Sequence, residues 1–168
     1  MIPSIQLRPF TRAEYHDFFE GYEADPRMDP RPYRYRYEHV DQRFDAEQER
    51  FDWYPTFGIF RTEDDRCLGC LSLKRIDQEN TTCELGIILQ NDSVKGHGYG
   101  TAAVAAGVHM AHDRYGVRVI TAETAENNIP MQRVLEKTGF HMVNRIPYGF
   151  DLVDHWEDKL CYTLEVEA

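Results

Sequence analysis

Three glycines stand at alternate positions in the segment VKGHGYGTAAVAAG, which begins at Val94. They are Gly96, Gly98 and Gly100, and a run of small apolar residues follows them. Glycine in an ordered segment costs conformational entropy, so such a cluster needs a tight turn or a ligand to explain it. A glycine-rich turn before a helix presents free N–H groups and the positive end of the helix dipole. With Lys95 alongside, the segment predicts a diphosphate site; a plain glycine turn is the simpler alternative.

Two other phosphate motifs fit the same segment less well. A loop of the GxxxxGK[ST] type is excluded, because no Lys-Ser or Lys-Thr pair follows the glycines. Gly98, Gly100 and Ala103 satisfy the dinucleotide pattern G-x-G-x-x-[GA], and Glu123 lies near the end of the next strand. That pattern follows its strand after a very short turn, whereas about eight residues separate Leu89 from Gly98 here. A nicotinamide-dependent enzyme is therefore a weak alternative.

The glycine segment resembles the coenzyme A pyrophosphate loop of the GNAT acyltransferase superfamily, [RQ]-x-x-G-x-[GA]. Lys95, Gly98 and Gly100 occupy its three motif positions, with Lys in place of Arg or Gln. The segments CELGIILQNDSVKGHGYGTAA and ENNIPMQRVLEKTGF together resemble the ribosomal-protein N-acetyltransferase-like branch. The similarity runs from IQLRPF to DHWEDKLCYTL, and it is specific for the superfamily but not for a substrate.

The resemblance implies an N-acetyltransferase with acetyl-CoA as co-substrate and no metal. The acceptor would be a primary amine of a protein N-terminus or of a small molecule. A non-catalytic protein that binds or senses acyl-CoA is the alternative, because a residue that the reaction uses in many relatives is missing here.

The resemblance also implies where the coenzyme lies. The main chain of Ile87, Ile88 and Leu89 would pair with the pantetheine arm like an added strand, and an N–H near Ile87 or Ile88 would polarise the thioester carbonyl. Gly86 would mark a bulge that separates this strand from the next. Asn128 would cap its helix and contact the pantetheine. The coenzyme-binding residues implied are Ile87, Ile88, Leu89, Lys95, Gly96, His97, Gly98, Tyr99, Gly100, Thr101 and Asn128.

Glu84 is the candidate catalytic base, because it lies two residues before Gly86 on the same strand. It would take the proton of the amine directly or through water. A carboxylate at its ordinary pKa is a poor base for an alkylammonium, so burial would have to raise that pKa. The competing interpretations are an exposed strand carboxylate and a structural partner for an arginine. Alignment of the two substrates alone would supply much of the rate.

The proton donor for the leaving thiolate is not evident from the sequence. Many relatives carry a tyrosine on the last helix, at the position of Leu135, and the nearer branch often carries a serine at the position of Met131. Neither side chain found here can protonate a thiolate. Tyr99, Tyr148 or water would have to replace them.

The composition limits the classes of partner. The net charge is −10, from 29 acidic and 19 basic residues, which argues against general nucleic-acid binding. The segment RPYRYRYEH interleaves arginines with tyrosines, but acidic residues flank it closely, and the resemblance makes it part of the acceptor-side wall. No apolar stretch is long enough for a membrane span, and the first residues do not form a secretory signal. We therefore expect a cytoplasmic protein, for which a homodimer is compatible with the sequence.

Metal binding is not expected. The four cysteines include the pair Cys67 and Cys70, but side chains three apart on a strand face opposite sides, and no second pair completes a zinc site. His109 and His112 share a helical face without a third ligand. Both pairs are interpreted as ordinary packed or solvated side chains, with the thiols reduced.

The elements that position these residues follow from periodicity and turn signals. Strands are expected at 4–10, 81–90, 117–126, 141–146 and 158–168, with a hairpin of two strands at 56–76. Helices are expected at 11–22, 40–54, 99–115 and 128–140. Phe44, Phe51 and Trp53 are expected in the core. The order predicts one mixed α+β domain over 1–168, and the resemblance gives it the GNAT fold. That fold has a mostly antiparallel twisted sheet of about seven strands, a splayed central pair, and helices on both faces.

Overall fold

The computed structural model describes residues 3–167 and contains one seven-stranded sheet with the strand order β1-β2-β3-β4-β5-β7-β6. The chain order is strand, two helices, three strands, helix, strand, helix, two strands, as predicted. The elements are β1 (Ile5–Arg8), α1 (Arg12–Glu20), α2 (Tyr37–Glu49), β2 (Thr56–Arg61), β3 (Cys67–Asp77), β4 (Thr82–Leu89), the 3-10 turn η1 (Asp92–Val94), α3 (Tyr99–Tyr115), β5 (Val119–Ala125), α4 (Ile129–Lys137), β6 (His141–Asp151) and β7 (Trp156–Glu165).

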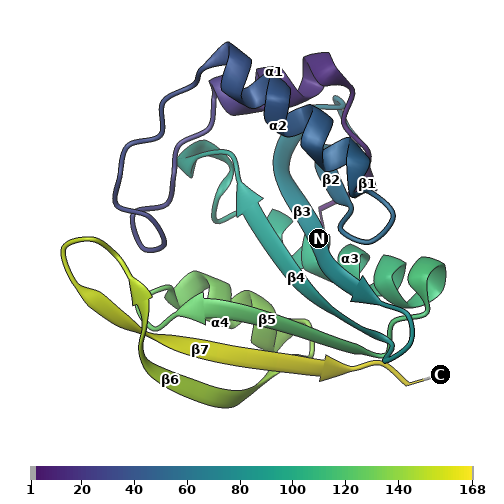
Figure 1. The fold of residues 1–168 in the computed structure, drawn as a ribbon, viewed down its shortest axis with the longest axis vertical. Coiled ribbons are helices and arrows are strands. Elements are labelled where there is room, and N and C mark those ends of the chain that lie inside the picture. The colour runs from purple at the N-terminus through teal and green to yellow at the C-terminus, as the bar shows by residue number, and fades with distance from the viewer. Residues whose placement is uncertain (1–2, 168) are drawn as a thin grey trace.

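The helices cover both faces of this sheet, and each face has its own core (Figure 1). On the α1–α2 face, aromatic residues of the two helices pack on Phe60 and Cys70 of β2 and β3. On the α3–α4 face, small residues of α3 pack on Leu71, Leu85 and Ile120. A Cβ at Gly107 of α3 would lie only 2.9 Å from Leu71 Cδ1, so α3 approaches the sheet closely. The mixed α/β single domain with a mostly antiparallel sheet is confirmed.

The centre of the sheet is weakly joined. β4 pairs with β3 from Thr82 to Leu89, but it pairs in parallel with β5 only over Thr82–Glu84 against Val119–Thr121. Beyond Glu84 the two strands diverge, as Figure 1 shows between β4 and β5. The expected bulge at Gly86 is wrong: Gly86 pairs in register with Ser72, and the irregularity lies in β3 between Lys74 and Asp77. Splaying therefore comes from loss of pairing with β5 and not from a kink in β4.

Local signals fix the helices that frame this opening. Thr11 and Glu14 form a capping box at the start of α1, and Arg8 donates two hydrogen bonds to Glu14, at 2.9 and 2.8 Å. Asn128 caps α4 by accepting a hydrogen bond from the Met131 amide. These caps satisfy N–H groups that the first helical turn leaves unpaired.

Several bounds differ from the sequence expectations. α2 begins three residues early, at Tyr37, and ends at Glu49, so Trp53 lies beyond the helix and is 51% exposed. Its expected place in the core is wrong, whereas Phe44 is buried. β6 continues to Asp151, five residues past its expected end. Residue 168, the end of the last expected strand, lies outside the described residues.

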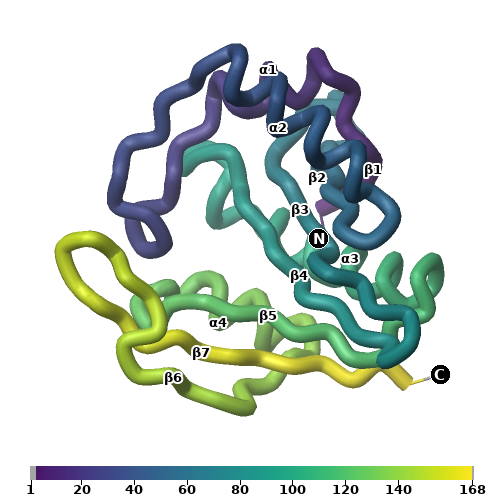
Figure 2. Tube along the Cα trace, in the orientation of Figure 1, coloured from purple at the N-terminus to yellow at the C-terminus, as the bar shows by residue number. Residues whose placement is uncertain are grey.

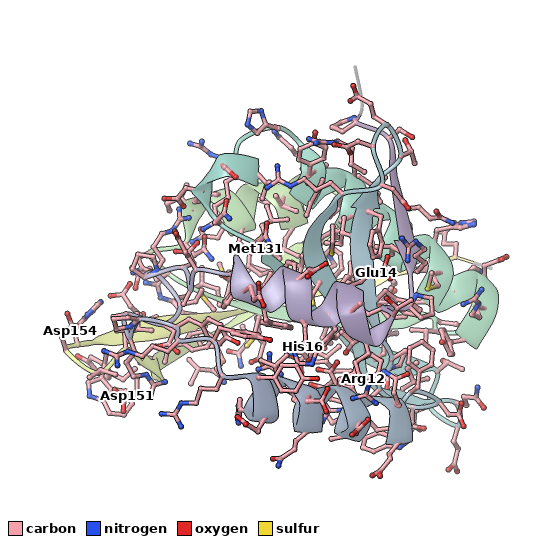
Figure 3. All side chains as sticks on the ribbon, turned by 90° about the horizontal axis from the view of Figure 1, so that it is seen from above. Arg12, Glu14, His16, Met131, Asp151 and Asp154 are labelled. Atoms are coloured by element: carbon pink, nitrogen blue, oxygen red, sulfur yellow. The ribbon has the colours of Figure 1, made fainter. Side chains whose placement is uncertain are left out.

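The segment between α1 and α2 and the tip between β6 and β7 lie at the same side of the molecule, beside the opening between β4 and β5 (Figure 2). Asp151 and Asp154 lie at that tip, well away from Arg12 and Glu14 on α1 (Figure 3). Across residues 3–167, no helix is both long and apolar enough to cross a membrane.

Candidate active site

A cleft of about 450 Å³ lies between the end of β4, the start of α3 and the start of α4. Its lining includes the residues that the diphosphate motif singled out, together with side chains from the α1–α2 segment. The lining residues are Tyr22, Asp25, Arg27, Met28, Asp29, Ile87, Ile88, Leu89, Lys95, Gly96, Gly98, Gly100, Thr101, Asn128, Pro130, Met131, Arg133, Val134 and Lys137.

The glycine segment turns the chain from β4 into α3. Gly96 and Gly98 have φ of 79° and 83°, in the left-handed region that side chains with a Cβ rarely adopt. Gly98 is the N-cap of α3, and no side chain within residues 3–167 caps it. The amides of the first turn of α3 therefore lack intrahelical partners at the edge of the cleft. This arrangement is suited to an anion.

The β4 edge of the cleft offers main-chain groups. Gln90 donates from its backbone to the Leu68 carbonyl at 2.8 Å, and the register of β3 and β4 continues regularly from there. Because antiparallel strands direct alternate residues toward the partner strand, Ile87 and Leu89 direct their N–H groups toward the opening, whereas Ile88 directs its own toward β3. Ile87, and not Ile88, has a free donor in the opening.

Two cations on the cleft wall are already paired with acids. Arg27 donates to both oxygens of Asp25, at 2.9 and 2.7 Å, and Lys95 Nζ lies 3.3 Å from Asp25 and 3.2 Å from Asp92. Burial opposes the ionisation of Asp25, but the hydrogen bonds from Arg27 and the charge of Lys95 outweigh it and lower its pKa to about 2. The α1–α2 segment is thus tied to the glycine segment through Asp25.

The α1–α2 segment is held on its other side by a buried histidine. His16, on α1, contacts Asp41 through Nε2 at 2.8 Å and the Tyr35 hydroxyl through Nδ1 at 2.7 Å. Its ring stacks on Tyr37 with 4.4 Å between centroids. In the middle of the segment, Met28 Sδ lies 3.9 Å from the Thr124 hydroxyl on β5. The segment therefore spans the opening from β4 to β5.

A family model described as an acetyltransferase (GNAT) domain matches residues 4–141. The chain belongs to the GNAT acetyltransferase family. The enzyme is 30% identical over 151 residues to the probable N-acetyltransferase YjcK of Bacillus subtilis (strain 168), a match that covers 88% of this chain and 80% of that protein. It is an N-acetyltransferase, and acetyl-CoA is its co-substrate.

Solved structures share the GNAT fold at low identity. RimL, a ribosomal L7/L12 alpha-N-protein acetyltransferase in complex with coenzyme A, has a TM-score of 0.85 and 16% identity, over 97% of this chain and 94% of that one. The spermidine N-acetyltransferase of Vibrio cholerae, in complex with coenzyme A and spermine, has a TM-score of 0.81 and 13% identity, over 96% and 95% of the two chains.

Most of the coenzyme residues implied by the sequence line the GNAT cleft, but two do not. His97 is exposed, with its ring centroid 6.1 Å from that of Tyr99. The Tyr99 hydroxyl accepts a hydrogen bond from Arg61 of β2 at 3.2 Å. Neither side chain is among the lining residues, so only their main-chain amides are available to a diphosphate.

Glu84 lies on the α1–α2 face, outside the cleft lining, because Cys83 and Leu85 on either side belong to the opposite core. Its side chain is 17% exposed and forms ion pairs with Arg75 and, at 3.8 Å, with Lys74. The Lys74 side chain crosses Gly86, where a Cβ would meet its Cε at 2.5 Å. The structure thus contains the arginine pairing that competes with the catalytic interpretation.

The two motif positions for a proton donor and the nearby tyrosines lie in different environments. Leu135 is buried in the core, Met131 lines the cleft, and Tyr148 is 71% exposed on β6. Tyr22 is the tyrosine that lines the cleft, and burial raises its pKa. Sequence reasoning missed Tyr22, Asp25 and Arg27, because nothing in their spacing shows that the α1–α2 segment closes over β4.

Proposed function

We propose that this N-acetyltransferase acetylates a primary amine, of a protein N-terminus or of a small molecule, that reaches the thioester from the α1–α2 face. The main support is the cleft itself: it joins uncapped amides of α3 to the open edge of β4, and its other wall is the α1–α2 segment. The coenzyme would fill the cleft from the α3 side and leave the opposite face for the acceptor.

The diphosphate would accept hydrogen bonds from the main chain of residues 96–101, beside Lys95. Acetyl-CoA brings the thioester, and this chain supplies the donors for it. Ile87 would donate its N–H to the thioester carbonyl and stabilise the oxyanion that forms when the amine attacks. Leu89 would pair with the pantetheine arm, and Asn128, which is 8% exposed, would hold the arm from the start of α4.

The proton of the acceptor amine would pass to Glu84, directly or through water. An alkylammonium, that of Lys74, already lies beside this carboxylate, so the site accommodates the cationic form of an amine. Entry of the acceptor would displace Lys74 and leave its own ammonium against Glu84. The neutral amine would then attack the thioester, and most of the rate would come from this alignment.

The departing thiolate needs a proton, and we propose Tyr22 as its source. A phenol in a buried setting stays protonated at neutral pH, which keeps its proton available for transfer. Tyr22 also packs between Phe18, Phe19 and Tyr33, which fixes its ring against the end of α1.

The relatives indicate which amines to test. One neighbour is named for acetylating a ribosomal-protein N-terminus and another was solved with spermine. We also propose a cytoplasmic location, since all four cysteines are free thiols.

Release of coenzyme A thiol from acetyl-CoA should be measured with peptides of varied N-terminal residue, with polyamines and with smaller amines. We expect release that depends on at least one of these acceptors. Tight coenzyme binding with no acceptor-dependent release would instead support a non-catalytic acyl-CoA sensor. A rise in melting temperature with NADH and none with coenzyme A would refute the coenzyme site itself.

A further inference from the structure

The α1–α2 segment is fixed to both strands at the open end of the sheet. The Glu23 amide donates to the Gln90 carbonyl at 2.8 Å, just beyond β4, and Met28 Sδ lies 3.9 Å from the Thr124 hydroxyl on β5. Figure 1 shows the segment beside the ends of β4 and β5, where the two strands diverge. The Met28 side chain therefore reaches β5 from this segment, and it also lines the cleft.

The strand register places this contact level with the proposed oxyanion donor. The parallel pairing of β4 with β5 ends at Glu84 and Thr121, and Ile87 and Thr124 each lie three residues farther along their strands. Because a strand advances by about 3.3 Å per residue, both lie about 10 Å beyond the last pair. Ile87 directs its N–H group into the opening, so this donor and Met28 face the same level of the cleft.

The position of the Met28 side chain is fixed by contacts of its own. Thr124 is polar but 0% exposed, and within residues 3–167 the Met28 sulfur is the one hydrogen-bond partner of its hydroxyl. A thioether is a weak acceptor, but a buried hydroxyl without a partner costs free energy, so this contact favours one orientation of a flexible side chain. The main chain is held as well, since the Met28 amide donates to the Asp25 carbonyl at 2.9 Å.

A thioester bound at Ile87 would direct its acyl chain toward Met28. A carbonyl carbon is trigonal, so its three substituents point in different directions. With the oxygen on the Ile87 N–H and the sulfur toward the glycine segment, the acyl chain is directed away from β4 and toward β5. Because Met28 contacts β5 at that level, a longer chain meets the thioether side chain where an acetyl group does not.

We propose that Met28 limits the length of the acyl group and so selects acetyl-CoA over longer acyl-CoA thioesters. This inference rests on the proposed function, since it takes the thioester carbonyl as bound to Ile87. An additional methylene in a closed apolar pocket typically changes kcat/KM by about tenfold or more, because neighbouring side chains must move to admit it. The contact with Thr124 restricts that movement.

The test compares acetyl-, butyryl- and hexanoyl-coenzyme A as donors to a confirmed amine, by kcat/KM, and as ligands, by titration calorimetry. The wild type should prefer acetyl to butyryl by about a hundredfold in kcat/KM. Met28→Ala should reduce this preference to about threefold, because the part of methionine that alanine lacks is slightly longer than the part of butyryl that acetyl lacks. Hexanoyl is longer still and should remain a poor donor, which distinguishes a limited widening from a general loosening of the site.

Two variants serve as matched controls. Met28→Leu keeps the volume of the side chain without the sulfur and should change the preference for acetyl by no more than about threefold. Met142→Ala makes the same substitution on β6, where the side chain is 50% exposed and outside the cleft lining, and should keep the full preference. The melting temperature of each variant shows whether it is folded.

The outcomes separate the role of Met28 from the proposed function. Equal use of acetyl- and butyryl-coenzyme A by the wild type, or an unchanged preference in folded Met28→Ala, would overturn the role of Met28 and leave the proposed function standing. If no thioester supports acceptor-dependent release, the proposed function fails and binding decides about Met28. Tighter binding of acetyl- than of butyryl-coenzyme A by the wild type, lost in Met28→Ala, would support its role, and equal binding by the wild type would overturn it.

Discussion

The two sides of the opening between β4 and β5 are formed by different kinds of chemical group. The side on which we propose that the coenzyme binds consists of main-chain groups, exposed by left-handed glycines and by a strand that has lost its neighbour. The side on which we propose that the acceptor binds consists of side chains that satisfy one another, such as Glu84 with Lys74 and His16 with Asp41. A main-chain site can bind the same ligand in chains of different sequence, whereas a side-chain site changes with each substitution. The difference is consistent with a co-substrate that the whole family shares and with acceptors that differ between the solved neighbours.

The largest effect should come from the acceptor side, at Glu84. Glu84→Gln removes the proposed proton acceptor and should lower kcat about a hundredfold, at the low end for a general base. The KM for acetyl-CoA should stay the same. Steady-state kinetics on a confirmed acceptor measures both.

Glu123→Gln is the matched control for that variant. Glu123 lies on the same face, on β5, and pairs with Lys159 at 3.3 Å. Its replacement should leave kcat within about twofold. If Glu123→Gln lowers kcat and Glu84→Gln does not, the base belongs to β5 and our assignment is wrong.

The next effect concerns the coenzyme side, at the two ends of α3. Gly98 and Gly116 are its N-cap and C-cap, and both are left-handed, with φ of 83° and 68°. Gly98→Val and Gly116→Val should each lower the free energy of unfolding by about 1–2 kcal/mol. Only Gly98→Val should also weaken coenzyme A binding, by about tenfold. If the two variants bind coenzyme A with equal affinity, the main-chain amides at the start of α3 do not form the coenzyme site.

A smaller effect should arise where the two sides meet. Asp25→Asn removes the carboxylate that holds Lys95 and should tighten coenzyme A binding about threefold, because a freed ammonium can face the diphosphate. Asp45→Asn, on α2 and paired with Arg12, should leave the affinity unchanged. Weaker binding by Asp25→Asn would mean that Asp25 orients the cations for the ligand and does not compete with it.

The smallest effect is a pH dependence in the layer that supports the acceptor side. Hydrogen bonds from Arg8 lower the pKa of Glu14 from 4.5 to about 2, so this carboxylate stabilises the fold fully above pH 4.5 and loses that effect as the pH falls toward 2. Glu14→Gln should be less stable than the wild type by about 1 kcal/mol at pH 6. In chemical unfolding curves, the difference in stability between this variant and the wild type should disappear between pH 4.5 and pH 2. A difference that stays constant over this range would contradict the role of Glu14.

The sequence predicted the bounds of α3 better than those of α2 and β6. The bounds of α3 agree with expectation, because glycines stop it at both ends and apolar residues repeat between them. α2 begins early because its N-cap, Arg36, makes no side-chain hydrogen bond, so no capping signal marks the start. β6 continues past its expected end at Ile146, because a strand on the outer edge of the sheet can accommodate Pro147.

Contacts between segments that are distant in the sequence account for the site features that the sequence did not predict. Tyr22 and Asp25 reach the cleft because the Glu23 amide donates to the Gln90 carbonyl at 2.8 Å, a contact that no local pattern encodes. The pairing of Glu84 with Arg75 likewise depends on the left-handed turn of β3 at Arg75, with φ of 51°. Such contacts form only when the sheet is assembled, so no local pattern in the sequence predicts them.

Only three residue pairs join β4 to β5, so the two halves of the sheet share a short seam. A pantetheine arm lying along β4 would supply, from the substrate, part of the hydrogen bonding that a neighbouring strand normally gives. Each catalytic cycle would then complete and reopen the sheet, and protection of the β4 amides against hydrogen exchange would rise and fall with coenzyme occupancy.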